Sequence, residues 1–294
     1  MWGMSSKNFL NAIAYCLFPL LLYYVVYEAA GYVLVLAAAS VASSGWDRAA
    51  LWTAAHAGDV SAMTGAAAMA AGFLAIHRTA AQEAPLTWKV SSRLFSTAAG
   101  VVLALSSALF LNLVISMSGA SSSDAGASSA AAQTAAVSLP LGLVYYGILS
   151  PFIEETVFRG ITFGRICSVL RAAGEEGGGS AEKDAAPGEP APDLPKAAQE
   201  RRYDIAAAVL SSLLFGIYHG NVVQGFYAFC MGIIFCVFRE LTGSLAAAAL
   251  LHGTVNAMTL ILSQSGLYAQ LCTPAWLVAF LAIAVCSGVC LRRQ

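Results

Sequence analysis

The chain has 294 residues, of which 59% are hydrophobic and 11% are charged. A soluble domain carries about 25% charged residues, so the composition excludes an ordinary soluble fold and indicates that lipid covers most of the surface. The formal net charge of −1 gives no excess of basic residues, which excludes electrostatic binding to nucleic acid.

Apolar runs long enough to cross a bilayer recur along the chain. A transmembrane helix needs about 20 mostly apolar residues, because lipid offers no partner for an open backbone amide. The runs lie at 9–36, 59–77, 93–117, 139–168, 203–220, 222–239, 243–262 and 274–291. We therefore predict an all-α, polytopic membrane protein with about eight transmembrane helices. The first run exceeds the roughly 7–15-residue core of a signal peptide, so we expect it to be a retained helix.

Basic residues fall on alternate connections between the predicted helices. They include Lys7, Arg78, Lys89, Arg93, Arg239, Arg292 and Arg293. The connections at 116–138 and 263–274 hold no Lys or Arg. By the positive-inside rule the basic connections are cytoplasmic, and both termini are expected in the cytoplasm.

One connection has a different composition. Residues 172–200 are rich in Gly, Ala, Pro and charges of both signs. They include a run of three glycines, Gly177-Gly178-Gly179, and the prolines Pro187, Pro190, Pro192 and Pro195. This composition predicts a flexible cytoplasmic linker.

The fourth predicted helix carries Glu154, Glu155 and Arg159. Charged groups in a membrane span are costly, so each needs a cavity, a partner or a chemical purpose. Helical spacing places Glu155 and Arg159 on one face and turns Glu154 away by about 100°. We expect Arg159 to keep Glu155 ionised while Glu154 points elsewhere. In the alternative interpretation the two carboxylates mark a helix end at the cytoplasmic edge.

Two later helices add polar groups. His219 lies near the end of the fifth apolar run, where a single histidine is usually a structural hydrogen-bonding group. His252 and Asn256 are four residues apart on one face of the seventh run, which is expected to line a wet interior cavity. Gly216 and Gly253 remove bulk where a neighbouring helix or a substrate backbone approaches.

Whether these groups meet depends on the fourth helix. If it continues through Arg159 and Arg165, Glu154 and His219 reach a common depth. If it leaves the membrane at Arg159, the two lie near opposite faces and the site fails.

The three groups resemble the signature of the CPBP family of intramembrane proteases, which includes the type II CAAX prenyl endopeptidases and the bacterial ABI proteins. That signature is EExxxR, then FxxxH, then HxxxN or HxxxD. It is matched here by Glu154–Arg159, Phe215–His219 and His252–Asn256. The Thr242-Gly243-Ser244-Leu245 segment before His252 is also similar to the family.

The resemblance implies three parts of the chain. They are N-terminal transmembrane helices at 1–138, a protease core at 139–262 that contains the linker 172–200, and a C-terminal transmembrane helix at 263–294. It also implies an integral protein, in the plasma membrane of a bacterium.

The activity implied is hydrolysis of a peptide bond in a membrane-associated protein or peptide. The residues implied are Glu154, His219, His252 and Asn256, supported by Glu155 and Arg159. Glu154 and the first histidine would activate water, while the second histidine and the amide would stabilise the oxyanion. The two supporting residues would fix the first carboxylate in place.

A metal-dependent version of the site uses the same residues. Glu154, His219 and His252 would bind a divalent ion such as zinc, which would carry the attacking water. The sequence has no HExxH motif, so both versions stay open.

Other functions are compatible with a membrane protein of this kind. Bacterial members of the family are linked to bacteriocin immunity, so a non-proteolytic immunity or scaffold protein is the main alternative. A transporter is a third interpretation, in which the polar groups form an ion path. The substrate is a prenylated CAAX protein or another membrane peptide, such as a signal-peptide remnant or a pheromone precursor.

The remaining polar residues predict less. His56 and His77 are expected at helix boundaries or in hydrogen bonds, and Glu28 is expected either to be neutral or to line the same cavity. The seven cysteines include no CxxC pair and are interpreted as small buried hydrophobic residues.

Overall fold

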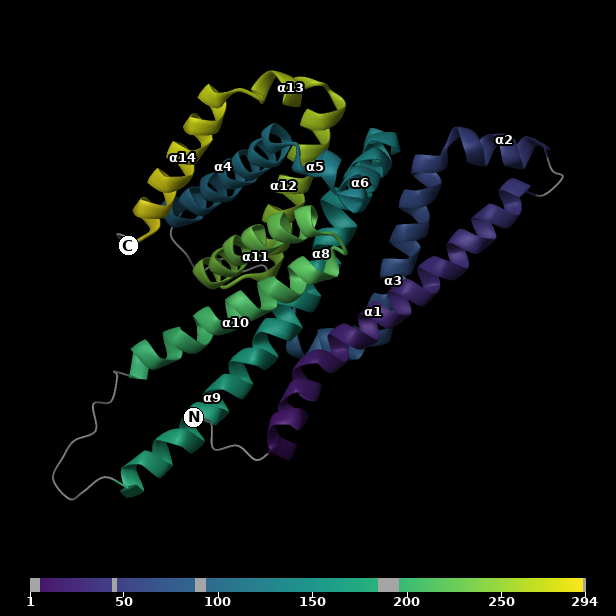
Figure 1. The fold of residues 1–294 in the computed structure, drawn as a ribbon. Coiled ribbons are helices and arrows are strands. Elements are labelled where there is room, and N and C mark those ends of the chain that lie inside the picture. The colour runs from purple at the N-terminus through teal and green to yellow at the C-terminus, as the bar shows by residue number, and fades with distance from the viewer. Residues whose placement is uncertain (1–5, 44–46, 88–93, 185–195, 293–294) are drawn as a thin grey trace.

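The computed structural model describes residues 6–43, 47–87, 94–184 and 196–292. Within these residues every regular element is helical, which confirms the predicted all-α fold (Figure 1). Lys89, Arg93, Arg293 and the four linker prolines lie outside the described residues.

The helices follow one another with short connections. The N-terminal ones are α1 (Ser6–Ser43), α2 (Asp47–Ala55), α3 (Ala57–Glu83), α4 (Leu94–Ser118), α5 (Ala120–Ser123) and α6 (Ala125–Ala136). A continuous helical run then comprises α7 (Leu139–Val144), η1 (Tyr145–Leu149), α8 (Ser150–Glu155), η2 (Thr156–Thr162) and α9 (Phe163–Asp184), in which η1 and η2 are π-helical. The last helices are α10 (Lys196–Tyr218), α11 (Val222–Thr242), α12 (Leu245–Gln264), α13 (Leu267–Leu271) and α14 (Pro274–Arg292).

Six of the described helices are long and apolar enough to span a membrane, namely α1, α3, α4, α11, α12 and α14. A seventh span is possible if α6 and the run from α7 to α9 count as one, although the two are bent by 119°. The predicted 203–220 span lies in α10, which begins among charged residues such as Arg201 and Arg202. By length and composition the described helices therefore supply six or seven spans, and the predicted number of eight stays a prediction.

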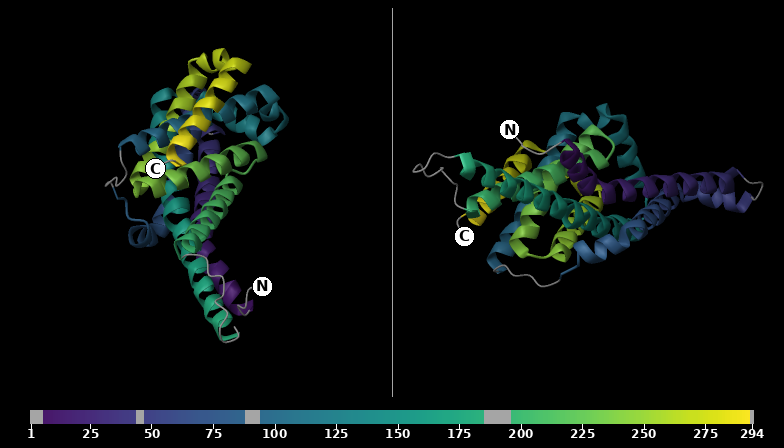
Figure 2. Two further views of the ribbon diagram at one scale, coloured as in Figure 1. Left: turned by 90° about the vertical axis from the view of Figure 1, so that its left-hand side faces the viewer. Right: turned by 90° about the horizontal axis from the view of Figure 1, so that it is seen from below.

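The helices form a central bundle with two flanking pairs. α1 and α3 lie side by side and project from the bundle as an arm, while α4 and α14 pair on the opposite side (Figures 1 and 2). α8, α11 and α12 lie between these pairs. The start of α1 and the end of α9 lie toward the bottom of Figure 1 and the end of α14 lies at its left, whereas α2, α5, α6 and α13 lie toward the top. The cytoplasmic location of the termini stays a prediction.

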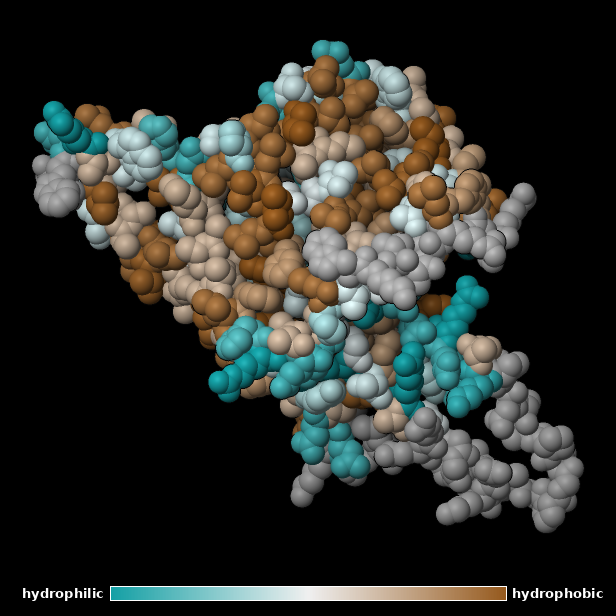
Figure 3. Space-filling model, turned by 180° about the vertical axis from the view of Figure 1, so that it is seen from behind, coloured by the Kyte–Doolittle hydropathy of each residue, from teal (hydrophilic) through white to brown (hydrophobic). Residues whose placement is uncertain are grey.

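The outer surface has the character that lipid requires. Large apolar side chains are exposed on the flanking helices, for example Phe18 and Val33 on α1 and Val278 and Val285 on α14. In Figure 3 apolar side chains cover the upper part of the visible face, and hydrophilic ones gather toward its lower end. A surface of this kind is stable in a bilayer and marks an integral membrane protein.

The predicted flexible linker is wrong for part of its length. Helix α9 continues through residues 172–184, and α10 already begins at Lys196. Only residues 185–195 lie outside the described part of the chain. Alanine, glutamate and lysine are good helix formers, so this stretch extends α9 even though its composition resembles that of a linker.

Candidate active site

The two adjacent glutamates lie in the middle of the long run from α7 to α9. This run continues past Arg159 to Asp184, so the continuous helix on which the predicted site depends is present. Glu154 and Glu155 end α8, between the π-helical segments η1 and η2. A π-helical turn changes the direction of the side chains that follow it, and such turns are frequent at functional sites.

Glu155 and Arg159 form the predicted ion pair. Arg159 Nη1 lies 3.1 Å from Glu155 Oε1, and both side chains are fully buried. The guanidinium carbon of Arg159 also lies 4.1 Å from the centre of the Phe215 ring, in a cation–π contact. Glu155 and Arg159 are thus paired inside the protein, as the spacing predicts.

His252 on α12 joins both glutamates. Its Nδ1 lies 2.9 Å from Glu155 Oε1, and its Nε2 lies 3.8 Å from Glu154 Oε2. The imidazole stacks on Phe235 with 4.5 Å between ring centroids. Because the Glu155 carboxylate only accepts hydrogen bonds, Nδ1 carries the hydrogen and Nε2 is directed toward Glu154.

Glu154 is held by a residue that the sequence analysis did not identify. The Ser150 hydroxyl donates to Glu154 Oε1 at 2.7 Å from one turn earlier in the helix. Glu155 and Arg159 contact His252 and each other, so the predicted role of this pair in fixing Glu154 would act through His252. The four-residue spacing of Ser150 and Glu154 was the available signal.

His219 lies at the end of α10, half-buried beside the same aromatic ring as His252. The centroid of the Phe215 ring is 4.8 Å from that of His219 and 5.9 Å from that of His252. The Nδ1 of His219 donates to the Phe215 carbonyl at 2.8 Å, which leaves Nε2 available. The two histidines thus approach one another from different helices, around a phenylalanine that belongs to the predicted motif.

Asn256 lies one turn after His252 on α12 and is half-buried. Its Nδ2 donates to the carbonyl of Tyr146 in η1 at 3.1 Å. One amide hydrogen therefore binds the helix that carries the glutamates. A single further hydrogen remains for an oxyanion.

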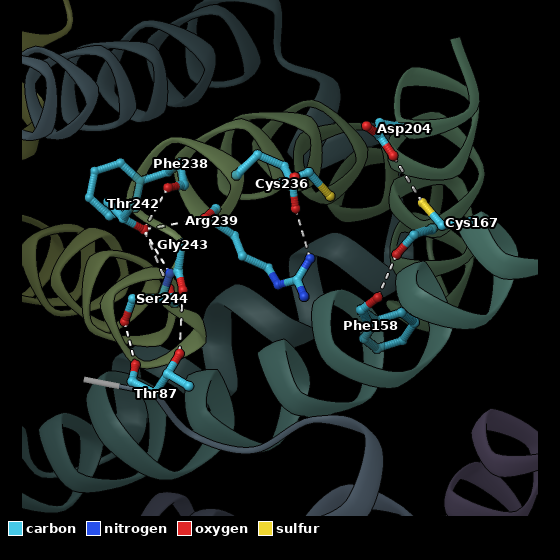
Figure 4. A network of polar contacts seen from close by, with 12 residues as sticks. Thr87, Phe158, Cys167, Asp204, Cys236, Phe238, Arg239, Thr242, Gly243 and Ser244 are labelled. Atoms are coloured by element: carbon cyan, nitrogen blue, oxygen red, sulfur yellow. Dashed lines mark hydrogen bonds and ion pairs between the residues drawn. The ribbon is translucent and has the colours of Figure 1, made fainter. Parts of the chain in front are cut away.

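The turn before α12 sets the position of His252. Gly243 has a φ of 66° and ends α11, and the Ser244 hydroxyl accepts a hydrogen bond from the Ala247 amide at the start of α12. Ser244 also donates to the carbonyl of Thr87 from the connection after α3 (Figure 4). This explains in physical terms why Thr242-Gly243-Ser244-Leu245 precedes the histidine.

The two glycines near the histidines lie at close helix contacts. A Cβ on Gly253 would collide with the carbonyl oxygen of Gly147, and one on Gly216 would lie 2.6 Å from the carbonyl oxygen of Gly225. The prediction that these glycines allow close approach is confirmed for neighbouring helices. The first contact holds α12, which carries His252, against the helical run that carries Glu154, and the second holds α10, which leads to His219, against α11.

A metal site is not assembled from these side chains. Across residues 6–43, 47–87, 94–184 and 196–292, no three His, Cys, Asp or Glu side chains are grouped as a metal ion requires. Glu154, His219 and His252 are therefore not grouped as the ligands of one metal ion in this part of the chain, although His252 Nε2 lies 3.8 Å from Glu154 Oε2.

The other polar residues lie away from this pocket. The Nδ1 of His56 donates to the Trp52 carbonyl at 2.9 Å, and the Nδ1 of His77 donates to the Leu74 carbonyl at 2.6 Å. Glu28 is exposed on α1. All seven cysteines are free, and Cys16, Cys167 and Cys236 are buried as predicted. Cys230 and Cys272 are half-buried and Cys286 and Cys290 are exposed, so the prediction of burial is wrong for these four.

The fold and site together define a polytopic helical membrane protein with a buried cluster of carboxylates and imidazoles. A family model described as type II CAAX prenyl endopeptidase Rce1-like matches residues 136–258. This part of the chain is similar to that family, which confirms the predicted resemblance. Neither the curated proteins nor the solved structures gave a match.

Proposed function

We propose that the chain is an intramembrane endopeptidase in which Glu154 activates the attacking water. The observation that carries the proposal is the group formed by Glu154, Glu155, Arg159 and His252, all buried and joined across two separate helices. Burial of this many charged groups costs free energy and needs a purpose. The match of residues 136–258 to a family of endopeptidases supplies the class of reaction.

The first step is attack on the scissile carbonyl. A distance of 3.8 Å between Glu154 Oε2 and His252 Nε2 is too long for a direct hydrogen bond and suits a bridging water. Glu154 takes a proton from this water while the hydroxide adds to the carbonyl carbon. The same carboxyl group then returns the proton to the departing amine.

The negative charge on the tetrahedral oxygen needs donors. His252 provides one through Nε2 when it carries a proton, and Asn256 provides one through its remaining amide hydrogen. Glu155 orients the imidazole through Nδ1 and is itself held by Arg159. His219 directs its free Nε2 toward substrate or water from the other side of Phe215.

The substrate is a membrane-associated protein or peptide. Its scissile bond must reach the buried cluster of Glu154 and His252 between the helices, so the substrate enters from the lipid or from the membrane surface. The family match favours a prenylated CAAX protein. A peptide without a prenyl group is the competing substrate.

The deciding experiment compares Glu154→Gln with wild type. The substitution keeps the size of the side chain and removes the base, so peptidase activity should fall by about 10²–10⁴-fold. Membrane peptidomes of cells expressing each form would reveal uncut precursors and so identify the substrate. Glu28→Gln is the matched control, because it makes the same change on the exposed face of α1.

Two results would contradict the proposal. Equal cleavage by Glu154→Gln and wild type would remove the glutamate from the mechanism. If Glu154→Gln protects cells from a bacteriocin as well as wild type does and no precursor accumulates, the protein acts in immunity without proteolysis. Retention of activity after exhaustive chelation would separately exclude an essential metal.

A further inference from the structure

Asp124 joins the starts of two helices that are far apart in the sequence. It lies in the connection between α5 and α6 and is the N-cap of α6. Its Oδ1 accepts from the Ala127 amide at 3.0 Å, and its Oδ2 accepts from the amides of Val222 and Val223 at 3.1 and 3.2 Å. One carboxylate thus caps both α6 and α11.

The chemistry of this contact suits a carboxylate in particular. The first amides of a helix have no partner inside it, and the helix dipole makes that end positive. The two oxygens of an aspartate allow each helix its own acceptor, which no neutral capping residue of this size provides. Packing supports the join, since a Cβ on Gly126 would lie 2.8 Å from the Cβ of Asn221.

The start of α11 is connected directly to His219. Asn221 accepts from the Gln224 amide at 2.9 Å, and its Nδ2 donates to the carbonyl of His219 at 3.2 Å. Gly220 between them has a φ of 72°, which allows the chain to turn within one residue. The position of His219 therefore depends on where α11 begins.

We propose that Asp124 is a positioning residue for His219, holding the turn between α10 and α11 in the geometry that places the histidine beside Phe215. This inference rests on the proposed peptidase function. The residue is distant in sequence from the predicted motifs and lies outside the segment 136–258 that matches the family.

Asp59 provides a matched control. Its Oδ1 accepts from the Ser138 amide at 2.6 Å and so holds the opposite end of α6, where α7 begins. Like Asp124 it is a carboxylate that binds the amide at a helix start. Among the hydrogen bonds of the described residues, none joins Asp59 to the turn that carries His219. Asp59→Asn should therefore loosen α6 without displacing the histidine.

The experiment uses the full-length protein in detergent micelles with ¹⁵N-labelled histidine. Only four histidines are present, so the ring signals are few, and His219→Gln assigns the one of interest. Asp124→Asn should shift the His219 ring signals and accelerate hydrogen exchange at Val222 and Val223. Its kcat should fall by up to about 100-fold, with KM changed less, because a small displacement of a group near the reacting atoms has that effect.

A second variant guards against loss of folding. Asp124→Ser keeps a good N-cap for α6 but has one oxygen, so it should retain α6 and still release α11. Unchanged His219 signals and kcat in both variants, with faster exchange at Val222 and Val223, would show a helix cap only and overturn the proposal. If the variants shift the His219 signals but wild type itself has no peptidase activity, the positioning role is supported and the proposed function is refuted.

Discussion

Helices α12 and α14 have similar length and apolarity but opposite roles. The most apolar windows of the two have mean hydropathies of 1.7 and 2.2, yet 44% of the first is buried inside the protein and 6% of the second. α12 carries His252 and Asn256, whereas Ser287 is the one buried residue of α14 in the part of the chain that the structure describes. Hydropathy identifies a span, and intramembrane polar residues indicate which spans face the interior.

A similar contrast in electrostatic terms separates the interior of the bundle from the exposed faces of α9 and α10. Glu155 and Arg159 are fully buried, whereas the pair formed by Arg171 and Asp204 is partly exposed at 48% and 33%. A buried pair is costly to form and more costly to break, while an exposed pair contributes little. Substitutions matched between the two regions therefore test whether the bundle core is the demanding part of the fold.

The largest expected effect comes from Arg159→Ala. It leaves Glu155 buried without its cation, and loss of one partner of a buried pair costs about 3–5 kcal/mol. Thermal unfolding in detergent micelles would measure the change. Arg171→Ala, which breaks the exposed pair with Asp204, should cost about 0–1 kcal/mol. Equal losses for the two variants would show that burial does not distinguish the regions.

A pair of glycine substitutions gives the next largest difference, with opposite signs. Gly253→Ala on α12 forces a Cβ against the Gly147 carbonyl, and an overpacked core loses about 1–3 kcal/mol. Gly288→Ala on α14 meets no atom within 4 Å and should gain about 0.5–1 kcal/mol from helix propensity. Melting temperatures of the two variants should move in opposite directions. A gain in both would mean that α12 and η1 have room to separate.

Short-range features of this core could be predicted from the sequence. The Glu155–Arg159 pair, the common face of His252 and Asn256, and the glycine contacts each follow from helical spacing or residue size. Each needs only knowledge that the segment is a helix. The extension of α9 through residue 184 was missed because glycine and proline in the same connection indicated a linker.

The contacts between distant segments could not be predicted in the same way. His252 and Glu155 are 97 residues apart, and their hydrogen bond depends on the rotation of α12 against α8. That rotation is set by the π-helical turns, the Gly253 contact and the turn at Ser244, which no periodicity reveals. The sequence therefore predicted that Glu154 and His252 lie close together, but it did not predict the hydrogen bond between Glu155 and His252.

A smaller effect is expected from removing the hydroxyl that holds Glu154. Ser150→Ala deletes one hydrogen bond to a charged group, which contributes about 1.5–3 kcal/mol at most. A water that takes the place of the hydroxyl and binds Glu154 would offset part of this loss. Peptidase activity should fall more than stability, because Glu154 loses its orientation. Ser106→Ala on α4 is the control, since that buried hydroxyl donates only to the Val102 and Leu103 carbonyls of its own helix. Equal activity in the two variants would show that Ser150 has no part in positioning the glutamate.

The smallest expected effect is a pH dependence of the melting temperature that comes from Asp124, the carboxylate that joins the starts of α6 and α11. Hydrogen bonds from the Ala127 amide first, and from the Val223, Gly126 and Val222 amides, hold the pKa of Asp124 below its ordinary value of 3.8. A carboxyl group of lowered pKa stabilises the folded protein fully above its ordinary pKa. That stabilisation is lost as pH falls through the lowered value.

The melting temperature of wild type should therefore approach that of Asp124→Asn as the pH is lowered from neutral to below 3.8. The substituted side chain does not titrate, so the difference between the two proteins isolates this carboxylate from all others that protonate in acid. A difference that stays constant over the whole range would mean that the two helix starts are held by packing at Gly126, with no contribution from the charge.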